Sequence, residues 1–513
     1  MLTYIVRRLI AAVLILFGAS FLVYILTADS GDPLADLRQS NAPNREQLIQ
    51  QRIDLLDLDV PPILRYFSWV SGAVRCVVPF ALTCDLGNSV TGIEVTQLLG
   101  RAMGQTIMLV TAATILAIVI GITLGIVTAL RQYSGLDYGV TFMAFLFFSL
   151  PVFWVAVLLK EFGAIGFNNF LSEPDISFFA TMVCGLVGAF LFYLSTSGSL
   201  KRRLLWAAIG FVFAFGIIWF LDLTGWFLTP GFGPIVVALL SVGIAYGVTL
   251  LTAGLKNRKA LYSSLIVVAI GIVAYFAVQP LLDRATLLMV VLLGVATVLV
   301  GLVVGYFMGG YDKRQNMTAA GLTAFLMGFL ILLDRFMQAW PSYFNNNRVN
   351  GRPIATIGAS TPNLEGDFWV RGLDTYTHLL LPTIALMLIS LAGYSRYSRA
   401  SMLEIMNQDY IRTARAKGLG ERTVVMRHAF RNALIPLATL VAFDIGALIG
   451  GAIITEQVFA FSGMGQLFVQ ALGRQDLNPV MGVFLITGIV ALVFNLVADL
   501  VYSVLDPRVR VKA

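Results

Sequence analysis

Residues 105–129 read QTIMLVTAATILAIVIGITLGIVTA, a run of 25 residues without a single charged side chain. A helix needs about 20 mostly apolar residues to cross the hydrocarbon core of a bilayer. This run meets that length, and it is longer than the apolar stretch of an ordinary buried helix. It therefore predicts a membrane-spanning helix.

The composition of the whole chain agrees with this interpretation. The 513 residues are 58% hydrophobic and only 12% charged, with a mean hydropathy of +0.84. Soluble domains carry about 25% charged residues, so the composition excludes a soluble enzyme, a disordered chain and a nucleic-acid-binding domain. With three cysteines and two histidines in the chain, we expect no metal site.

Further apolar runs bounded by charge bring the expected number of membrane-spanning helices to about twelve. The runs are 9–26, 105–129, 138–159, 177–197, 204–221, 233–251, 261–282, 286–308, 318–333, 377–393, 434–454 and 480–505. The run 318–333 is the shortest. The first run follows Arg7 and Arg8 but lacks a good cleavage site, so we expect a retained helix rather than a signal peptide.

The charges between these runs predict the orientation. If the amino terminus lies inside, the inner segments hold 22 Lys and Arg against six Asp and Glu, and the outer segments hold 13 against 20. Cytoplasmic loops are enriched in Lys and Arg. Because the bias persists to the last segment, we expect an all-α polytopic membrane protein with both termini inside.

Three longer segments lie between the runs. Residues 27–104 and 334–376 are expected outside, and 394–433 inside. In the first segment, residues 63–83 suggest an interfacial helix. Cys76 and Cys84 lie in the same outer segment, where disulfides can form, and we expect them to be bonded.

The middle of the chain, residues 174–333, has a different sequence pattern. It contains six closely spaced runs with short links and no cluster of polar residues. Since six is even, adding this block leaves the topology of the flanking segments unchanged. We therefore interpret it as an inserted six-helix bundle of unknown role.

The inner segment 394–433 contains two short helical patterns separated by glycine. Asp409 is a suitable cap for a helix through Lys417, and Gly418 is a suitable stop. A second pattern begins after Gly420, and Ala414 and Ala416 give the first helix a small-residue face. Two interpretations remain open: a rigid projection that transmits force, or a basic surface that meets anionic lipid headgroups.

Here the sequence resembles the permease subunits of binding-protein-dependent ABC importers, in particular the oligopeptide and dipeptide branch. The general signature of these permeases is Glu-Ala-Ala, then three further residues, then Gly. Here it is altered to Arg412-Thr413-Ala414, three residues and Gly418. The peptide branch typically has Asp-Tyr-x-Arg-Thr-Ala-Arg-Ala-Lys-Gly-Leu, which matches residues 409–419. It also has Arg-His-Ala-x-Arg-Asn-Ala-Leu-x-Pro, which matches 427–436.

Other segments share the resemblance, which covers about 1–160 and 373–510 but not the middle block. These segments are residues 4–33, 85–89, 149–154, 446–456, 461–465 and 499–508. The resemblance implies a six-helix type I ABC importer core. It would consist of an amino-terminal helix (1–26), an outer loop (27–104), helices 2 and 3 (105–160), and helices 4 to 6 (377–510) with a coupling loop at 394–433.

The resemblance also implies partners in the inner membrane of a prokaryote. The coupling residues would be Asp409, Tyr410, Arg412, Thr413, Ala414, Arg415, Ala416, Lys417, Gly418 and Leu419. They would dock on a separate pair of ATPase subunits or domains, which would bind ATP and Mg²⁺. A second, homologous permease and an external solute-binding protein would complete an importer of peptides. The chain has no Gly-x-x-x-x-Gly-Lys-Ser/Thr phosphate loop, so we expect no bound cofactor and no ATP hydrolysis by this chain itself.

Two acidic residues, Asp444 and Asp499, fall within the apolar runs. A charge in the membrane must face a partner or a wet cavity. Asp444 is therefore a candidate for the translocation pathway, with a structural pair as the equal alternative, and Asp499 suits a structural role. The rival class is a self-sufficient polytopic carrier or a membrane-embedded enzyme. A carrier would need an ionisable relay or internal repeats, and an enzyme would need clustered polar residues.

Overall fold

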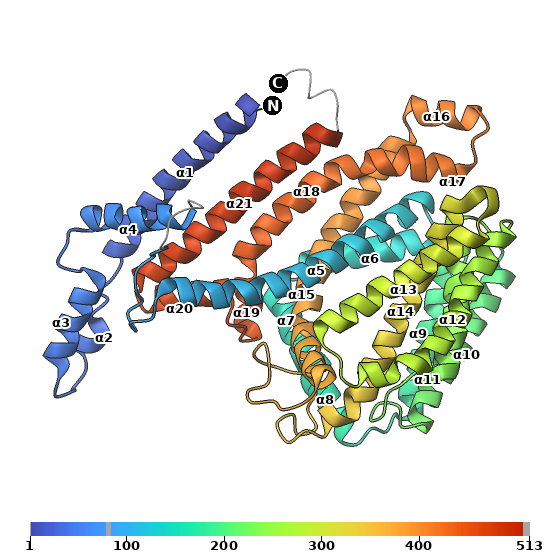
Figure 1. The fold of residues 1–513 in the computed structure, drawn as a ribbon, viewed down its shortest axis with the longest axis horizontal. Coiled ribbons are helices and arrows are strands. Elements are labelled where there is room, and N and C mark those ends of the chain that lie inside the picture. Colours follow the sequence, from blue (N-terminus) through green and yellow to red (C-terminus); the bar gives the residue numbers. More distant parts are fainter. Residues whose placement is uncertain (1, 78–83, 506–513) are drawn as a thin grey trace.

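A computed structural model describes residues 2–77 and 84–505, and the described residues are almost entirely helical (Figure 1). Among them, eleven helices are long and apolar enough to cross a membrane. A pair of helices separated by a sharp bend supplies a twelfth crossing if the pair is one span. The prediction of an all-α polytopic protein with about twelve spans is thus confirmed.

The bounds of the helices are as follows. The membrane helices are α1 (Leu2–Asp29), α5 (Val95–Leu130), α6 (Gly135–Ser149), α9 (Phe178–Ser195), α10 (Leu200–Leu223), α11 (Gly233–Thr252), α12 (Arg258–Leu282), α13 (Leu287–Met308), α14 (Lys313–Phe344), α15 (Phe368–Met406), α18 (Phe430–Gly451) and α21 (Leu477–Leu505). The shorter helices are α2 (Ala35–Arg38), α3 (Arg45–Leu56), α4 (Pro62–Val77), α7 (Val152–Leu158), α8 (Phe167–Ser172), α16 (Asp409–Ala416), α17 (Glu421–Thr423), α19 (Ile453–Val458) and α20 (Met464–Gly473).

Several helices extend beyond the apolar runs that predicted them. The shortest expected run, 318–333, is part of the 32-residue helix α14, so the expected boundary at 333 falls inside a helix. Helix α15 likewise has 39 residues. Their polar extensions are covered by other parts of the protein, which hydropathy along the sequence does not reveal.

The expected span 138–159 is broken. Helix α6 ends at Ser149 and α7 begins at Val152, and the two segments differ in direction by 105°. Pro151 lies between them in an extended conformation. Proline cannot donate a backbone hydrogen bond to a preceding turn, and it disfavours helical geometry at the residue before it.

Helices α5 and α15 cross at the centre of the molecule (Figure 1). They approach closely at Gly125, where an added Cβ atom would lie 2.6 Å from the carbonyl oxygen of Ser395. Farther along the same contact, Ala117 and Tyr394 are fully buried. Small residues allow such close helix packing in a membrane, where dispersion contacts replace the hydrophobic effect as the driving force.

The amino-terminal arm, which comprises helices α1 to α4, lies at one side of this centre. Helix α4 crosses α1, and the hydroxyl of the fully buried Tyr66 donates to the carbonyl oxygen of Phe17 at 3.1 Å. Helix α4 is not among the membrane-spanning helices. Residues 78–83 of the expected interfacial helix, and residues 506–510 of the expected core with the 506–508 part of the matching tail, lie outside the described residues.

Helices α9–α14 form a block at the opposite side, drawn in green and yellow in Figure 1. The indole of Trp369 on α15 donates to the carbonyl oxygen of Leu282 at the end of α12, at 2.7 Å. Within the block, the fully buried Asp334 accepts from the backbone N–H of Phe232 at 2.7 Å. The Trp369–Leu282 hydrogen bond therefore attaches the block to the core, and the Asp334–Phe232 hydrogen bond braces the block internally.

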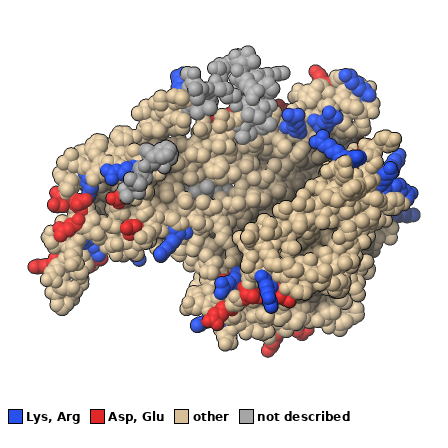
Figure 2. Space-filling model, in the orientation of Figure 1, with Lys and Arg blue, Asp and Glu red and all other residues tan. Residues whose placement is uncertain are grey.

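Charges separate toward the two ends of the helices. The first turn of α1, the last turn of α21 and helix α16 lie along the same edge in Figure 1. Figure 2 shows Lys and Arg gathered along that edge and over the ends of the block, whereas Asp and Glu concentrate at the other edge and on the arm. We call these the basic end and the acidic end.

Candidate functional site

The predicted coupling loop forms two short helices at the basic end. Helix α15 ends at Met406, and α16 begins after Gln408 rather than after a cap at Asp409. The chain then turns at Lys417–Gly420 and enters α17, a π-helical turn and α18. Figure 1 shows α16 projecting from the bundle, so the expected pair of helices broken at a glycine is present.

One face of α16 is buried against the bundle. Ile411 is fully buried and Ala414 is 7% exposed, and both pack against Met402 and Val424. Ala416 is exposed. The expected small-residue face is therefore divided, because Ala414 faces the protein and only Ala416 faces outward. Asp409, Tyr410, Arg412, Thr413, Arg415, Lys417, Gly418 and Leu419 are exposed as well.

Polar contacts brace the exposed side of the loop. The guanidinium of Arg415 donates to both carboxylate oxygens of Glu421, at 2.7 and 3.1 Å. These hydrogen bonds hold the pKa of the Glu421 carboxyl below its usual value. The amide of Asn432 on α18 donates to the hydroxyl of Tyr410 at 2.9 Å. Helix α16 is thus tied to the start of the next membrane helix.

The turn between the two short helices depends on Gly418. Its φ is +75°, in the left-handed region, and its N–H donates to the carbonyl oxygen of Arg415 at 2.9 Å. Glycine adopts this conformation without the steric cost that a Cβ atom adds. The left-handed backbone at this position therefore explains why glycine suits it.

A partly buried ion pair lies near the end of α15, before α16 begins. The Arg399 guanidinium on α15 donates to both carboxylate oxygens of Asp137 on α6, at 2.8 and 2.9 Å. Asp137 also accepts from the backbone N–H of Tyr133 at 3.1 Å. Sequence reasoning did not single out this pair. The one sequence signal for it was Asp137, an acidic residue in the inner link 130–137, which otherwise carries only the basic residue Arg131.

Asp444 lies apart from the coupling loop, in the second half of α18. It is half-buried, and its carboxylate lies near the hydroxyl of the fully buried Tyr394 on α15. Asp499, the other intramembrane acid, forms an ion pair with Arg8 on α1 at 3.2 Å. That pair supports a structural role for Asp499.

The 446–456 and 461–465 segments meet at a buried carboxylate. Glu456 is fully buried and accepts from the hydroxyl of Thr106 on α5 at 2.6 Å. It also accepts from the backbone N–H of Gln466 at 3.0 Å. The N–H of Met464 donates in turn to the Thr106 oxygen at 2.8 Å. This network links α5, α19 and α20, and sequence reasoning placed Glu456 in an outer loop instead.

The 85–89 segment is held at the acidic end. The backbone N–H of Val90 donates to the carboxylate of Asp476 at 2.9 Å. The amide of Asn478 donates to the carbonyl oxygen of Asn88 at 2.8 Å. Nearby in sequence, Cys76 and Cys84 are joined by a disulfide.

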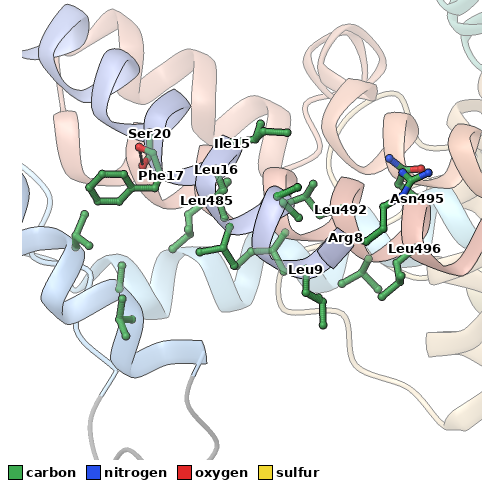
Figure 3. A pocket seen from close by; sticks show the side chains of 18 of the residues that line it. Arg8, Leu9, Ile15, Leu16, Phe17, Ser20, Leu485, Leu492, Asn495 and Leu496 are labelled. Carbon is green, nitrogen blue, oxygen red and sulfur yellow. Dashed lines mark hydrogen bonds between the residues drawn. The ribbon is translucent and has the colours of Figure 1, made fainter. Parts of the chain in front are cut away.

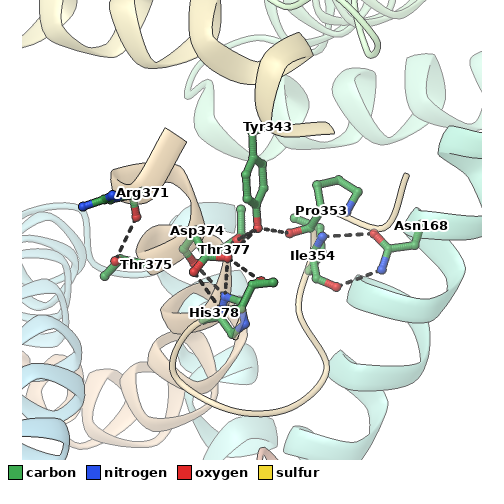
Figure 4. Close-up of polar contacts among 10 residues, drawn as sticks. Asn168, Tyr343, Pro353, Ile354, Arg371, Asp374, Thr375, Thr377 and His378 are labelled. Atoms are coloured by element: carbon green, nitrogen blue, oxygen red, sulfur yellow. Dashed lines mark hydrogen bonds and ion pairs between the residues drawn. The ribbon is translucent and has the colours of Figure 1, made fainter. Parts of the chain in front are cut away.

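A second polar network fastens the link between α14 and α15 (Figure 4). The Tyr343 hydroxyl bonds with Asp374 Oδ1 at 3.2 Å and with Thr377 Oγ1 at 2.9 Å. The hydroxyl of Thr361 in the link donates to the same Asp374 oxygen at 2.6 Å. All of these residues except Thr361 are almost completely buried. Asp374 therefore holds the outer loop in place. The Nδ1 atom of His378 lies 3.4 Å from Asp374 Oδ1.

An apolar groove of about 550 Å³ lies among α1, α4 and α21. Figure 3 shows Leu9, Leu16, Leu485 and Leu492 along it, with Arg8 toward one end. No group of three or more His, Cys, Asp or Glu residues suited to a metal ion occurs within 2–77 and 84–505.

The sequence is similar to those of known transport proteins. Residues 265–511 match the family described as binding-protein-dependent transport system inner membrane component. The oligopeptide transport system permease protein OppB of Mycobacterium tuberculosis is 26% identical over 511 residues, covering all of both chains. The permease protein AppB of Bacillus subtilis is 24% identical over 516 residues, covering 99% of this chain and all of that one.

A shorter and closer match occurs with the dipeptide transport system permease protein DppB of Escherichia coli. It is 44% identical over 140 residues, which are 27% of this chain and 41% of that protein. The apolar helices and the matching residues lead to one assignment. The chain is a multi-pass protein of the plasma membrane, and its residues 265–511 match the family of binding-protein-dependent transport system inner membrane components.

Proposed function

We propose that this chain is the permease subunit of an ATP-driven importer of oligopeptides or dipeptides. A second, homologous permease would complete the pathway, an external binding protein would deliver the peptide, and two ATPase subunits or domains would supply the force. The printed names of the relatives support the substrate class. The family description supports the dependence on a binding protein.

The observation that carries the proposal is the construction of α16. Its inner face is anchored by Ile411 and Ala414, while Asp409, Arg412 and Ala416 are exposed. The Arg415–Glu421 hydrogen bonds and the Asn432–Tyr410 hydrogen bond brace it against α17 and α18. A braced helix transmits displacement to the membrane helices, whereas a flexible loop would absorb it.

The basic end would face the cytoplasm, since Lys and Arg are retained on that side of membranes. ATP and Mg²⁺ would bind to the ATPase partners, and the exposed face of α16 would dock on them. The acidic end would then face the binding protein. We propose that the core comprises 1–160 and 377–510 and that the block at 174–333 is accessory to it.

The test compares two alanines of the same helix. The tagged chain is purified with its natural partner subunits and reconstituted in vesicles, and peptide uptake and ATP hydrolysis are measured. Ala416→Trp should leave the melting temperature unchanged, because the side chain is exposed, but should greatly reduce uptake per ATP. Ala414→Trp should instead lower the melting temperature, since a buried site is overpacked at a cost of about 1–3 kcal/mol or more.

Lys256→Trp is the matched control, since it places the same bulky group at an exposed position of the basic end, in the link between α11 and α12. It should affect neither property. Normal coupled uptake by the Ala416→Trp complex would contradict docking through α16. Uphill accumulation of peptide by this chain alone in vesicles would contradict the whole proposal and favour a self-sufficient carrier.

A further inference from the structure

A cavity of about 630 Å³ opens at the basic end between the core and the block. It lies between the turn that joins α5 to α6 and the turn that joins α9 to α10. Its lining combines two arginines, several hydroxyl groups and two aromatic rings: Arg131, Gln132, Ser134, Phe192, Ser195, Thr196, Ser197, Arg202 and Trp206. No acidic residue is among them.

The two arginines of the lining come from different helices. Arg131 follows α5, and its guanidinium donates one hydrogen bond to the carbonyl oxygen of Ser195 at 3.2 Å. Arg202 lies in the first turn of α10, and within the described part of the chain its guanidinium makes no hydrogen bond or ion pair. The nearest acid along the chain, Asp137, is already paired with Arg399. The cavity is therefore electropositive and has unused donors.

The neighbouring cations are engaged differently. Arg203 stacks over the ring of Tyr193, 3.9 Å from its centroid. Lys201 is exposed and does not line the cavity. Of the three consecutive basic residues, only Arg202 faces this space, which makes the arrangement specific to one side chain.

The remaining walls suit a lipid. The rings of Phe192 and Trp206 stack with centroids 6.5 Å apart and form the apolar wall. On the same helix, Leu205 lies three residues after Arg202 and is 61% exposed, which leaves an apolar side chain next to the cavity-lining face open toward the membrane. A molecule with an anionic head and acyl chains would match both parts.

We propose that this cavity binds the phosphate of an anionic phospholipid, with the headgroup between Arg131 and Arg202 and the chains along α10. Guanidinium groups bind phosphate oxygens through paired hydrogen bonds. Basic pockets between membrane helices at the cytoplasmic face bind such headgroups. The lipid would bridge the core and the block, where Arg131 and Ser195 already make one direct contact.

The test uses the full chain purified in neutral detergent with its partners. Phosphatidylglycerol, phosphatidylcholine and inorganic phosphate are added separately, and retained lipid is measured by native mass spectrometry together with the melting temperature. Phosphatidylglycerol should be retained and should raise the melting temperature, whereas phosphatidylcholine should do neither. Arg202→Ala combined with Arg131→Ala should weaken retention about thirtyfold, if each arginine contributes about 1 kcal/mol.

Arg202→Ala alone should weaken retention without lowering the melting temperature of the lipid-free protein, because this guanidinium has no internal partner to lose. Lys201→Ala is the matched control and should retain lipid as the natural chain does. Equal loss in Lys201→Ala would reduce the effect to general surface charge and overturn the site. A shift with inorganic phosphate that phosphatidylglycerol does not increase would assign the cavity to a soluble anion and overturn the lipid.

Discussion

Arg399 on α15 and Asp137 on α6 are 262 positions apart in sequence, yet they share two hydrogen bonds of 2.8 and 2.9 Å. The Asp137 side chain is 3% exposed and that of Arg399 is 32% exposed. The pair joins two membrane helices next to the coupling loop. Its geometry places a buried carboxylate between two helices that would have to hold together if α16 is moved as proposed.

Removing the arginine should destabilise the protein strongly. Arg399→Ala leaves the Asp137 carboxylate buried without its partner, at a cost of about 2–4 kcal/mol once the partial exposure of the arginine is allowed for. The melting temperature in detergent should fall clearly. Arg412→Ala is the control, since its ion pair with Asp409 is exposed, and it should leave the melting temperature unchanged.

A double variant tests the pair itself. Asp137→Asn combined with Arg399→Ala should be more stable than Arg399→Ala alone, because no uncompensated charge remains. The single variant Asp137→Asn is measured as well. If the loss of stability in the double variant equals the sum of the losses in the two single variants, Arg399 acts through packing and not through this carboxylate.

Gly418→Ala should loosen the coupling loop. The residue has φ of +75°, and a Cβ atom in left-handed geometry costs about 1–2 kcal/mol. Hydrogen exchange at 409–419 should accelerate, and uptake per ATP should fall. Gly420→Ala is matched to it, since Gly420 has φ of −58° and open space around the added Cβ. Equal effects of the two substitutions would exclude backbone strain as the cause.

Gly125→Ala should separate α5 from α15. The added Cβ atom would lie 2.6 Å from the Ser395 carbonyl oxygen, and both atoms belong to packed helices. Overpacking of this kind costs about 1–3 kcal/mol, so the melting temperature should fall. Gly104→Ala on the same helix meets nothing within 4 Å and should not destabilise the protein. A stable Gly125→Ala protein would mean that the two helices can shift apart easily.

The stability of the acidic end should depend on Asp476. Burial raises the pKa of its carboxyl to about 6, although the Val90 N–H bond and the charges of Arg474 and Arg52 oppose the shift. The folded protein then holds this proton more tightly than the unfolded chain, whose pKa is about 4. The free energy of unfolding should therefore fall as pH rises from about 4 to 6 and then level off.

Asp476→Asn removes the titration and keeps an oxygen that can accept from Val90. Melting temperatures measured from pH 4 to 7 should lose this component of the slope in the variant. An identical pH profile in the natural chain and in Asp476→Asn would exclude the carboxyl as its source.

Much of the fold could be predicted because apolar length and the local pattern around Gly418 are properties of contiguous residues. The same reasoning assigned Glu456 and Asp374 to outer loops, since their charge suggested contact with water. Both are buried, because Thr106 and Tyr343 supply hydrogen bonds from other helices. Ala414 was expected among the residues that dock on a partner, yet it packs against the bundle. Which side of a short helix is covered depends on residues distant in sequence, such as Ala129 and Met402.

The Cys76–Cys84 disulfide has a consequence for biogenesis. In the proposed orientation the ribosome releases both thiols into a reducing compartment, where they stay unpaired. They can be oxidised only after the amino-terminal arm has been translocated. In pulse-labelled cells, the oxidation state of this pair would therefore distinguish two populations. Chains that are still being inserted would have reduced thiols, and chains that have completed export of the arm would have the disulfide.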